Sequence, residues 1–420
     1  MNTTRPALKP LDTALAELLV FAKTLTEVEQ VSTFDADNRV LAQDLVSPLQ
    51  VPPQDNSAMD GYAVRAADVT GPGAALPVSQ RIAAGSSGTG LQSGTIARIF
   101  TGAPIPPGAD AVVMQEECEV VGEASGSEGK PAQAAVVRIN AAVQPGQNIR
   151  RAGEDVRLGS VVLQRGERLT PAALGLAASV GRPDLTVVRR PRVALFSTGD
   201  ELVMPGDVAP RDMKPGAIFN SNRFFQRALL VRLGCTVTDM GIVPDQRAAT
   251  IDALREASAA HDVVLTCGGV SVGEEDHVRP AVLALGELDM WQISIKPGKP
   301  FAYGRVGAAH FIGLPGNPVS SLVTFMLLVR PFLLRLQGVR DVVPRPVALR
   351  ADFAWPRPDR RREFLRARYN AVGGLDLFPN QSSGVLTSAV WGDGLVDTQP
   401  GVAITPGDAV QFLSFTSLLN

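Results

Sequence analysis

The first half of the chain combines one helical pattern with a longer region of strand patterns. Within 11–23 the apolar residues recur at helical spacing, which predicts a helix with one packed face. Between about 51 and 188 short apolar runs broken by Gly and Pro predict strands, at 97–100, 111–114 and 135–139 among others. The segment 122–133 is rich in Gly, Ser, Ala and Glu, and we expect it to be the disordered tip of a hairpin. The apolar face of the helix consists of Leu15, Leu18, Leu19 and Ala22.

Beyond a polar joint at 189–192, strand patterns alternate with glycine-bearing loops and helical patterns. This alternation predicts a parallel sheet that is covered by helices on both faces. Ligands of such sheets bind beyond the carboxyl ends of the strands, so we expect the loops after Ser197, Cys267 and Leu314 to converge on one crevice. The predicted strands are 193–197, 236–243, 263–267 and 311–314, and the predicted helices are 221–233, 246–260, 276–285 and 319–336.

The pattern after Pro344 returns to short strands with turn signals, which predicts a small all-β domain. A chain of 420 residues is too long for one hydrophobic core, so several domains are expected. The predicted fold class is multidomain α/β plus β. It has a central parallel-sheet α/β domain at 191–340, a β-rich inserted domain at 51–144 and a small, β-barrel-like domain at 341–420. An N-terminal linker domain of mixed α/β structure takes 1–50 together with 145–190.

Composition and charge limit the kinds of partner that the protein is expected to bind. The chain carries 40 basic and 42 acidic residues, so its net charge of -2 provides no long-range field for nucleic acid or for an anionic membrane. Neither the N-terminal thirty residues nor the apolar run at 322–329 is long or apolar enough to predict a membrane span or a secretory signal. The three cysteines lie far apart and predict buried thiols in a reducing cytosol, so we expect a cytoplasmic protein.

Two acidic motifs offer oxygen ligands. The segment 55–63, Asp-Asn-Ser-Ala-Met-Asp-Gly-Tyr-Ala, reads either as an Asx-type turn or as a metal or substrate loop. The segment 198–202, Thr-Gly-Asp-Glu-Leu, follows a predicted buried strand. Its acids could cap a short helix, or they could bind a hard divalent cation such as Mg²⁺.

Three further motifs suit an anion. The loop 266–276 has three glycines, which let backbone N–H groups approach a phosphate, although an ordinary strand-to-helix loop is the alternative. The segment 296–300, Lys-Pro-Gly-Lys-Pro, fixes two positive charges on a stiff backbone, or it is a basic exposed turn. The segment 313–320 leads from a strand into a helix start that suits an oxyanion, or it is a simple helix entry. The sequence contains neither a P-loop nor a Cys/His zinc pattern, and its histidines show no triad pattern.

Read together and in this order, the five motifs resemble those of the molybdopterin molybdenumtransferases, the family that includes the second enzymatic domain of gephyrin. The resemblance covers nearly the whole chain. It implies a homodimer with four domains per subunit, in which the linker domain also serves dimerisation. It also implies the reaction of adenylylated molybdopterin with molybdate to give molybdenum cofactor and AMP, assisted by Mg²⁺, with a molybdopterin adenylyltransferase as the upstream enzyme.

The resemblance carries functional roles to individual positions of this chain. The implied catalytic residues are Asp55, Glu201, Asp245, Asp276 and Lys296, of which Glu201, Asp245 and Asp276 hold the metal. The implied substrate-binding residues are Thr101, Gly268, Gly269, Ser271, Gly273, Lys299, Pro315, Pro318, Arg366 and Ser383.

The chain departs from the family pattern at two places. Gln292 stands where close relatives often carry a lysine, which removes one positive charge near the molybdate end. The stretch that ends at Asp276 and His277 also lacks the aromatic residue commonly seen beside the aspartate.

Two rival functions remain. A molybdopterin adenylyltransferase would share the α/β core, but its glycine loop reads Gly-Gly-Thr-Gly, where this chain has Gly-Gly-Val-Ser at 268–271. A non-catalytic scaffold would tolerate loss of the acidic ligands, yet all four implied acids are present.

Overall fold

The computed structural model describes residues 8–122, 135–269 and 277–419. The chain divides into two compact units. We call 44–164 with 171–183 the inserted unit, and the rest of the chain the main unit. The predicted hairpin tip at 122–133 lies, apart from Gly122, outside the described residues.

The inserted unit is built around a six-stranded sheet with the order β7-β4-β6-β5-β9-β8. The predicted runs at 97–100, 111–114 and 135–139 are confirmed as strands β6, β7 and β9. Alternating side chains of β4 point to two apolar clusters, since Tyr62 and Val64 belong to one and Ala63 to the other. The strands of this sheet are β4 (Gly61–Val64), β5 (Ala74–Ile82), β6 (Ile96–Ile99), β7 (Ala111–Met114), β8 (Cys118–Gly122) and β9 (Val136–Ile139). Smaller elements are β2 (Leu45–Val46) with β11 (Val161–Leu163), β3 (Asn56–Ser57) with β10 (Ile149–Arg150), and α2 (Pro171–Ser179).

The main unit contains a second six-stranded sheet, with the order β16-β13-β17-β21-β20-β18. The first four strands are parallel, as predicted, but β20 pairs antiparallel with both of its neighbours, β21 and β18. The sheet is therefore mixed, and the prediction of a parallel sheet is wrong for β20. A tight turn at Gly307, with φ of 58°, reverses the chain between β20 and β21, and such a hairpin can only join antiparallel strands. The strands are β13 (Arg192–Thr198), β16 (Thr236–Val243), β17 (Val263–Cys267), β18 (Gly286–Gln292), β20 (Pro300–Val306) and β21 (Ala309–Leu314).

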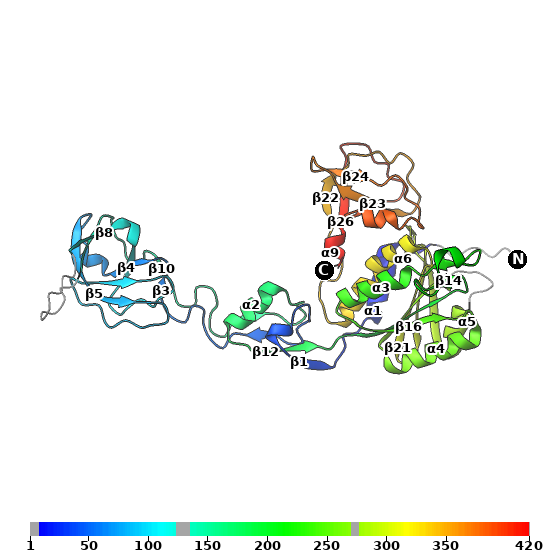
Figure 1. Cartoon of the computed structure of the whole chain (residues 1–420), viewed down its shortest axis with the longest axis horizontal. Helices are drawn as coiled ribbons and strands as arrows, with labels where there is room; N and C mark the ends of the chain where they lie inside the picture. The colour runs from blue at the N-terminus through cyan, green and yellow to red at the C-terminus, as the bar shows by residue number, and fades with distance from the viewer. Residues whose placement is uncertain (1–7, 123–134, 270–276, 420) are drawn as a thin grey trace. The chain divides into compact units, whose positions relative to one another are not determined.

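Helices cover both faces of this sheet (Figure 1). Along β13, Val193 and Leu195 pack into one core and Ala194 and Phe196 into the other, which is the alternation of a strand buried on both sides. The first core includes α1 (Leu11–Phe21), α3 (Asn222–Arg232) and the run α6 (Pro318–Thr324), η5 (Phe325–Val329) and α7 (Arg330–Leu336). The second includes α4 (Arg247–Ala260) and α5 (Val278–Leu285).

The N-terminal helix is confirmed, but its position differs from the predicted linker domain. Its buried residues Leu11, Ala14, Leu15 and Leu18 belong to the core of the α/β sheet. The chain then continues into β1 (Val28–Ser32), which pairs with β12 (Asp184–Val188).

One helical run, 318–336, is long and apolar enough to cross a membrane, and 89% of its most apolar window is buried inside the fold. A helix that is apolar all round and covered by protein is the central helix of a large core. In the described residues its surroundings are therefore those of a core helix.

The C-terminal residues form a third sheet with the order β19-β23-β25-β26-β22, and β24 pairs with β23. Strand β19 (Ile295–Lys296) comes from the Lys-Pro-Gly-Lys-Pro segment and pairs in parallel with β23. A bridge between Ala351, the residue directly after β22, and Leu375 of β24 joins the two ends of the strand path, and Asp352 N donates to Leu375 O at 3.0 Å. A strand order that returns to its start is the arrangement of a small barrel, and the β-barrel-like form of this domain stays a prediction. The other elements are β22 (Val347–Arg350), β23 (Arg362–Tyr369), β24 (Leu375–Leu377), α8 (Thr387–Trp391), β25 (Gly394–Thr398), β26 (Ala409–Ser414) and α9 (Phe415–Leu419).

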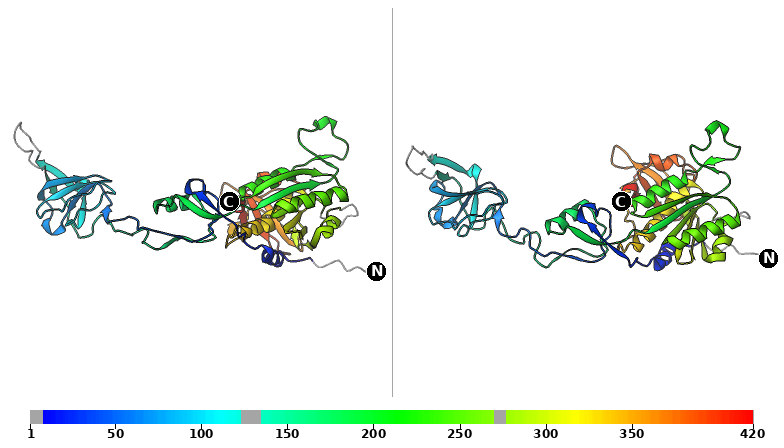
Figure 2. Two further views of the ribbon diagram at one scale, coloured as in Figure 1. Left: turned by 90° about the horizontal axis from the view of Figure 1, so that it is seen from below. Right: turned by 60° about the horizontal axis from the view of Figure 1, so that its bottom comes forward.

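An excursion at 199–219 leaves the carboxyl end of β13 and returns at α3. It contains the short parallel pair β14 (Leu202–Val203) and β15 (Ile218–Phe219). Figure 2 shows this excursion, in green, as an arm beside the α/β sheet. Because both of its ends lie at the carboxyl edge of the sheet, the excursion extends the wall of any site there.

Candidate active site

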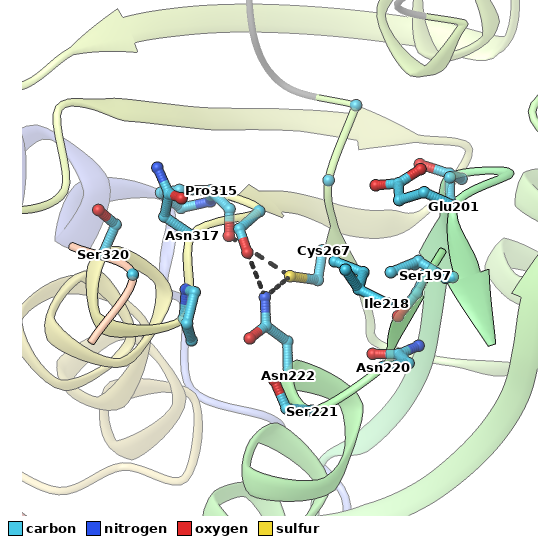
Figure 3. A pocket seen from close by; sticks show the side chains of 18 of the residues that line it. Ser197, Glu201, Ile218, Asn220, Ser221, Asn222, Cys267, Pro315, Asn317 and Ser320 are labelled. Atoms are coloured by element: carbon cyan, nitrogen blue, oxygen red, sulfur yellow. Dashed lines mark hydrogen bonds between the residues drawn. The ribbon is translucent and has the colours of Figure 1, made fainter. Parts of the chain in front are cut away.

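A cavity of about 790 Å³ lies at the carboxyl edge of the α/β sheet (Figure 3). It is lined by the loops that follow Ser197, Cys267 and Leu314, so the predicted convergence of these loops is confirmed. The start of α3 and both ends of the excursion complete the wall, together with Asp245, Pro300 and Gly384.

The floor of the cavity is held by a hydrogen-bonded set around Asn222, the first residue of α3 (Figure 3). Its Nδ2 donates to Gly316 O at 2.6 Å and to Cys267 Sγ at 3.0 Å. The Cys267 thiol in turn donates to Pro315 O at 3.4 Å. Burial raises the pKa of Cys267, so the sulfur stays a neutral thiol that fixes the loop at 315–316. Sequence reasoning missed this role of Asn222, because no motif includes it.

Gly268 and Gly269 line the cavity and could not be other residues without a shift of their neighbours. Their φ angles are 93° and 65°. A Cβ at Gly268 would lie 2.9 Å from Thr198 O, and one at Gly269 would lie 2.4 Å from a methyl of Val278. The glycines therefore let the loops after β13 and β17 pack closely. Ser271, Gly273 and Asp276 lie outside the described residues.

Two of the three implied metal ligands, Glu201 and Asp245, line the same cavity. Gly199 brings the first of them into place, since a Cβ there would lie 2.5 Å from Glu201 Oε2. The backbone N–H of Asp245 donates to Asp200 Oδ1 at 3.3 Å, which joins the loop after β16 to the loop after β13. Within the described part of the chain no three His, Cys, Asp or Glu residues form a metal cluster, and Asp276 is not in that part.

The two lysines of the Lys-Pro-Gly-Lys-Pro segment have different surroundings. Lys296 Nζ lies 3.1 Å from Glu363 Oε1 and 3.4 Å from Asp359 Oδ2, and Lys296 is not among the residues that line the cavity. Lys299 forms no ion pair with any described residue, and the adjacent Pro300 lines the cavity. Among the described residues, carboxylates within ion-pair distance are found for Lys296 but not for Lys299.

The other residues of the main unit that the resemblance assigns to substrate binding also differ in whether they line the cavity. Pro315 and Pro318 line the cavity. The Ser383 carbonyl accepts from the Val319 N–H at 2.9 Å, and its neighbour Gly384 reaches the cavity wall.

Arg366 does not line the cavity. It is 1% exposed, and its guanidinium donates to Ser388 Oγ, Phe364 O and Ser382 O. Burial lowers its pKa to about 10. In this arrangement Arg366 holds the 381–388 loop that carries Gly384.

The implied residues Asp55 and Thr101 belong to the inserted unit. Asp55 accepts from Ala152 N at 2.9 Å and from Arg151 Nη1 at 2.6 Å, and these bonds lower its pKa. Thr101 donates through both its N–H and its hydroxyl to Asp60 Oδ1, at 2.7 Å each, and this lowers the pKa of Asp60. Asp60 is a partner that sequence reasoning did not single out, although it lies in the first acidic motif.

Gln292, the departure from the family pattern, ends strand β18. Its carbonyl accepts from Lys9 N at 2.7 Å, and Lys9 Nζ lies 4.4 Å from the ring centre of Trp291. A positive charge is therefore present next to Gln292, but it comes from the N-terminal segment and is paired with Glu17.

Comparison with known proteins gives a consistent assignment over the length of the chain. The family descriptions "MoeA N-terminal region (domain I and II)", "Probable molybdopterin binding domain" and "MoeA C-terminal region (domain IV)" match 9–181, 194–335 and 348–415. The chain is 42% identical over 332 residues to the molybdopterin molybdenumtransferase of Haemophilus influenzae, covering 79% of this chain and 78% of that protein. It is 37% identical over 366 residues to molybdopterin molybdenumtransferase 2 of Mycobacterium tuberculosis, covering 84% and 85%.

Solved structures agree with this assignment. The crystal structure of the molybdopterin biosynthesis moeA protein from Pyrococcus horikoshii superposes with a TM-score of 0.82 at 28% identity, covering 97% of this chain and all of that one. Since the similarity to the curated relatives extends over most of both chains, this chain belongs to the molybdopterin molybdenumtransferase family.

Proposed function

We propose that this protein inserts molybdenum from molybdate into adenylylated molybdopterin and releases AMP, with Mg²⁺ as cofactor, in molybdenum cofactor biosynthesis. The observation that carries the proposal is the cavity at the carboxyl edge of the α/β sheet. It brings acidic side chains, glycine backbone and the loop before α6 to one place, and its volume of about 790 Å³ is that of a small-molecule site.

The donor set of the cavity fits Mg²⁺. Glu201 and Asp245 present carboxylate oxygens to one cavity, and Mg²⁺ prefers a few carboxylates together with water and phosphate oxygens. These two residues would hold the ion, with Asp276 as the third ligand that the family resemblance implies. When bound, the ion neutralises charge on the phosphoanhydride.

The chain's own residues would act on the rest of the substrate. The N–H group of Gly269 would approach a phosphate, whereas that of Gly268 donates to Leu314 O at 3.1 Å and would hold the loop in place. Pro315 and Pro318 line the cavity, and Lys299 directly precedes Pro300 of its wall, so these residues would form the molybdate end, where a positive charge balances the anion. Asp55 and Thr101 remain proposed contributors from the inserted unit.

The deciding experiment measures AMP release by the purified full chain from adenylylated molybdopterin, with and without molybdate and Mg²⁺. We expect release that depends on both. Asp276→Ala should abolish turnover and leave the thermal unfolding unchanged. If the wild-type protein shows no molybdate-dependent AMP release, the proposed function is wrong.

The same assay separates the rivals. A molybdopterin adenylyltransferase would instead consume ATP and molybdopterin, and a scaffold would do neither. We also propose a cytoplasmic homodimer that receives its substrate from a molybdopterin adenylyltransferase. Sedimentation of the purified protein tests the dimer.

A further inference from the structure

The ammonium group of Lys296 lies between two carboxylates that come from a distant part of the sequence. Glu363 Oε1 is 3.1 Å from Lys296 Nζ and Asp359 Oδ2 is 3.4 Å from it. Strand β19, which ends in Lys296, pairs in parallel with β23 and places Lys296 opposite Glu363 in the register. The contact is therefore fixed by backbone pairing as well as by charge.

Glu363 is a buried carboxylate whose two oxygens have different surroundings. Its side chain is 1% exposed. Its Oε2 accepts from Trp355 Nε1 at 2.9 Å and from Asp359 N at 2.8 Å. Its Oε1 makes no directed hydrogen bond among the described residues, so the charge of Lys296 is what compensates it there. A buried carboxylate without such compensation is strongly destabilising, which makes this pairing the reason the acid can stay in place.

Asp359, the second carboxylate beside Lys296, is held by an arginine. The Arg361 guanidinium donates to both of its oxygens at 2.9 Å, and these bonds lower the pKa of Asp359 well below its usual range. Two carboxylates and two cations thus balance in this cluster. The side chain of Lys296 remains 40% exposed.

The rest of the turn continues from this anchor to the cavity. Gly298, with φ of 112°, packs so closely that a Cβ would lie 2.5 Å from Thr324 Oγ1, and Pro300 two residues later lines the cavity. The position of Lys296 therefore sets where the turn begins, and the packing of Gly298 sets its course.

We infer that Glu363 and Asp359 form a carboxylate clamp that positions Lys296, and with it the whole turn, for binding of the molybdate substrate. The inference rests on the proposed function and adds two positioning residues to it. The clamp acts through Lys296 and does not itself touch the substrate. Its effect is to remove rotamer freedom from a long flexible cation before the anion arrives.

The test replaces Glu363 with glutamine, which keeps the acceptor for Trp355 and Asp359 N but removes the charge that faces Lys296. In the AMP-release assay we expect the KM for molybdate to rise about tenfold while kcat changes less than about twofold, because only binding of the anion depends on the clamp. The matched control is Asp397→Asn in the neighbouring strand β25. Its carboxylate is 6% exposed and pairs with Arg362, so this variant should loosen the same sheet and leave the KM for molybdate unchanged.

The measured KM values decide whether Glu363 positions Lys296 or has another role. An unchanged KM, or an equal rise in Glu363→Gln and Asp397→Asn, overturns the clamp, since the effect would then be absent or merely structural. A lower KM also overturns it, because the acids would then only neutralise the lysine. If Glu363→Gln does not fold, Asp359→Asn is used, with an expected rise of about threefold. Loss of molybdate-dependent turnover in the wild type would reject the proposed function itself, which the comparison between variants does not address.

Discussion

Replacing Gly298 with alanine should destabilise the main unit more than the same change at Gly307, although both glycines lie in tight turns with positive φ. At Gly307, φ is 58° and the nearest atom to a new Cβ is Ser258 Oγ at 3.9 Å, so only the backbone cost of about 1–2 kcal/mol applies. At Gly298, φ is 112° and the new Cβ would lie 2.5 Å from Thr324 Oγ1 and 3.0 Å from a methyl of Ile295. Overpacking in a rigid core adds roughly 1–3 kcal/mol, giving a total of roughly 2–5 kcal/mol.

Tryptophan fluorescence during denaturant unfolding measures this difference, because all three tryptophans, Trp291, Trp355 and Trp391, belong to the main unit. Adding Thr324→Ala to Gly298→Ala should recover part of the lost stability, since it removes the closest atom. Equal unfolding midpoints for Gly298→Ala and Gly307→Ala would refute the close packing of the turn. Molybdate-dependent activity should fall with Gly298→Ala and persist with Gly307→Ala.

Three further predictions concern buried and acidic groups. Burial lowers the pKa of His310 from 6.5 to about 4. As pH falls from 6.5 to 4 the unfolded chain therefore binds a proton that the folded chain does not, and the stability of the main unit should decrease by roughly 3 kcal/mol. Above about pH 6.5 the stability should change little. In the variant His310→Gln this part of the pH dependence should disappear from the unfolding midpoints, and an unchanged slope would contradict the assignment. Asn222→Leu leaves Gly316 O without its hydrogen-bond donor, which should lower the stability by about 1–3 kcal/mol and raise the KM for the pterin substrate. An unchanged melting temperature and KM would show that the floor of the cavity does not depend on Asn222. Glu201→Gln, at an exposed position, should change stability by less than about 0.5 kcal/mol yet raise the Mg²⁺ concentration needed for activity, and an unaltered Mg²⁺ titration would remove Glu201 from the proposed metal site.

The elements that sequence reasoning predicted well are those whose pattern follows directly from burial. The strands at 236–243 and 263–267 match β16 and β17 residue for residue, and 246–260 differs from α4 by one residue. Their apolar periodicity is a local property, so it is visible without knowing the neighbours. Strands β18 and β20 were not predicted because charged, glycine and proline residues interrupt their apolar pattern. They are stabilised instead by antiparallel pairing, of β18 with β20 and of β20 with β21.

The candidate site likewise has some features that the sequence predicts and others that depend on distant residues. Convergence of three loops on one edge follows from topology and was predicted correctly. The surroundings of Lys296 and Arg366 depend instead on which distant residues fold beside them. A lysine in a basic motif looks free in the sequence, yet Glu363 faces it in the fold. Arg366 suggests an anion ligand, yet carbonyl groups and Ser388 use its donors.

The contacts of Lys296 and Arg366 also show how the C-terminal sheet supports the cavity without lining it. Residues Phe364, Leu395 and Leu413 of that sheet belong to the same apolar core as the α/β sheet, so the two sheets are joined by shared burial and not only by a linker. From this core, strand β23 sends Glu363 to Lys296 on one side and Arg366 to the 381–388 loop on the other. That loop reaches the cavity through Gly384 and bonds to the start of α6 through Ser383. One strand therefore fixes two separate parts of the cavity's surroundings, and a change that shifts β23 must alter both together.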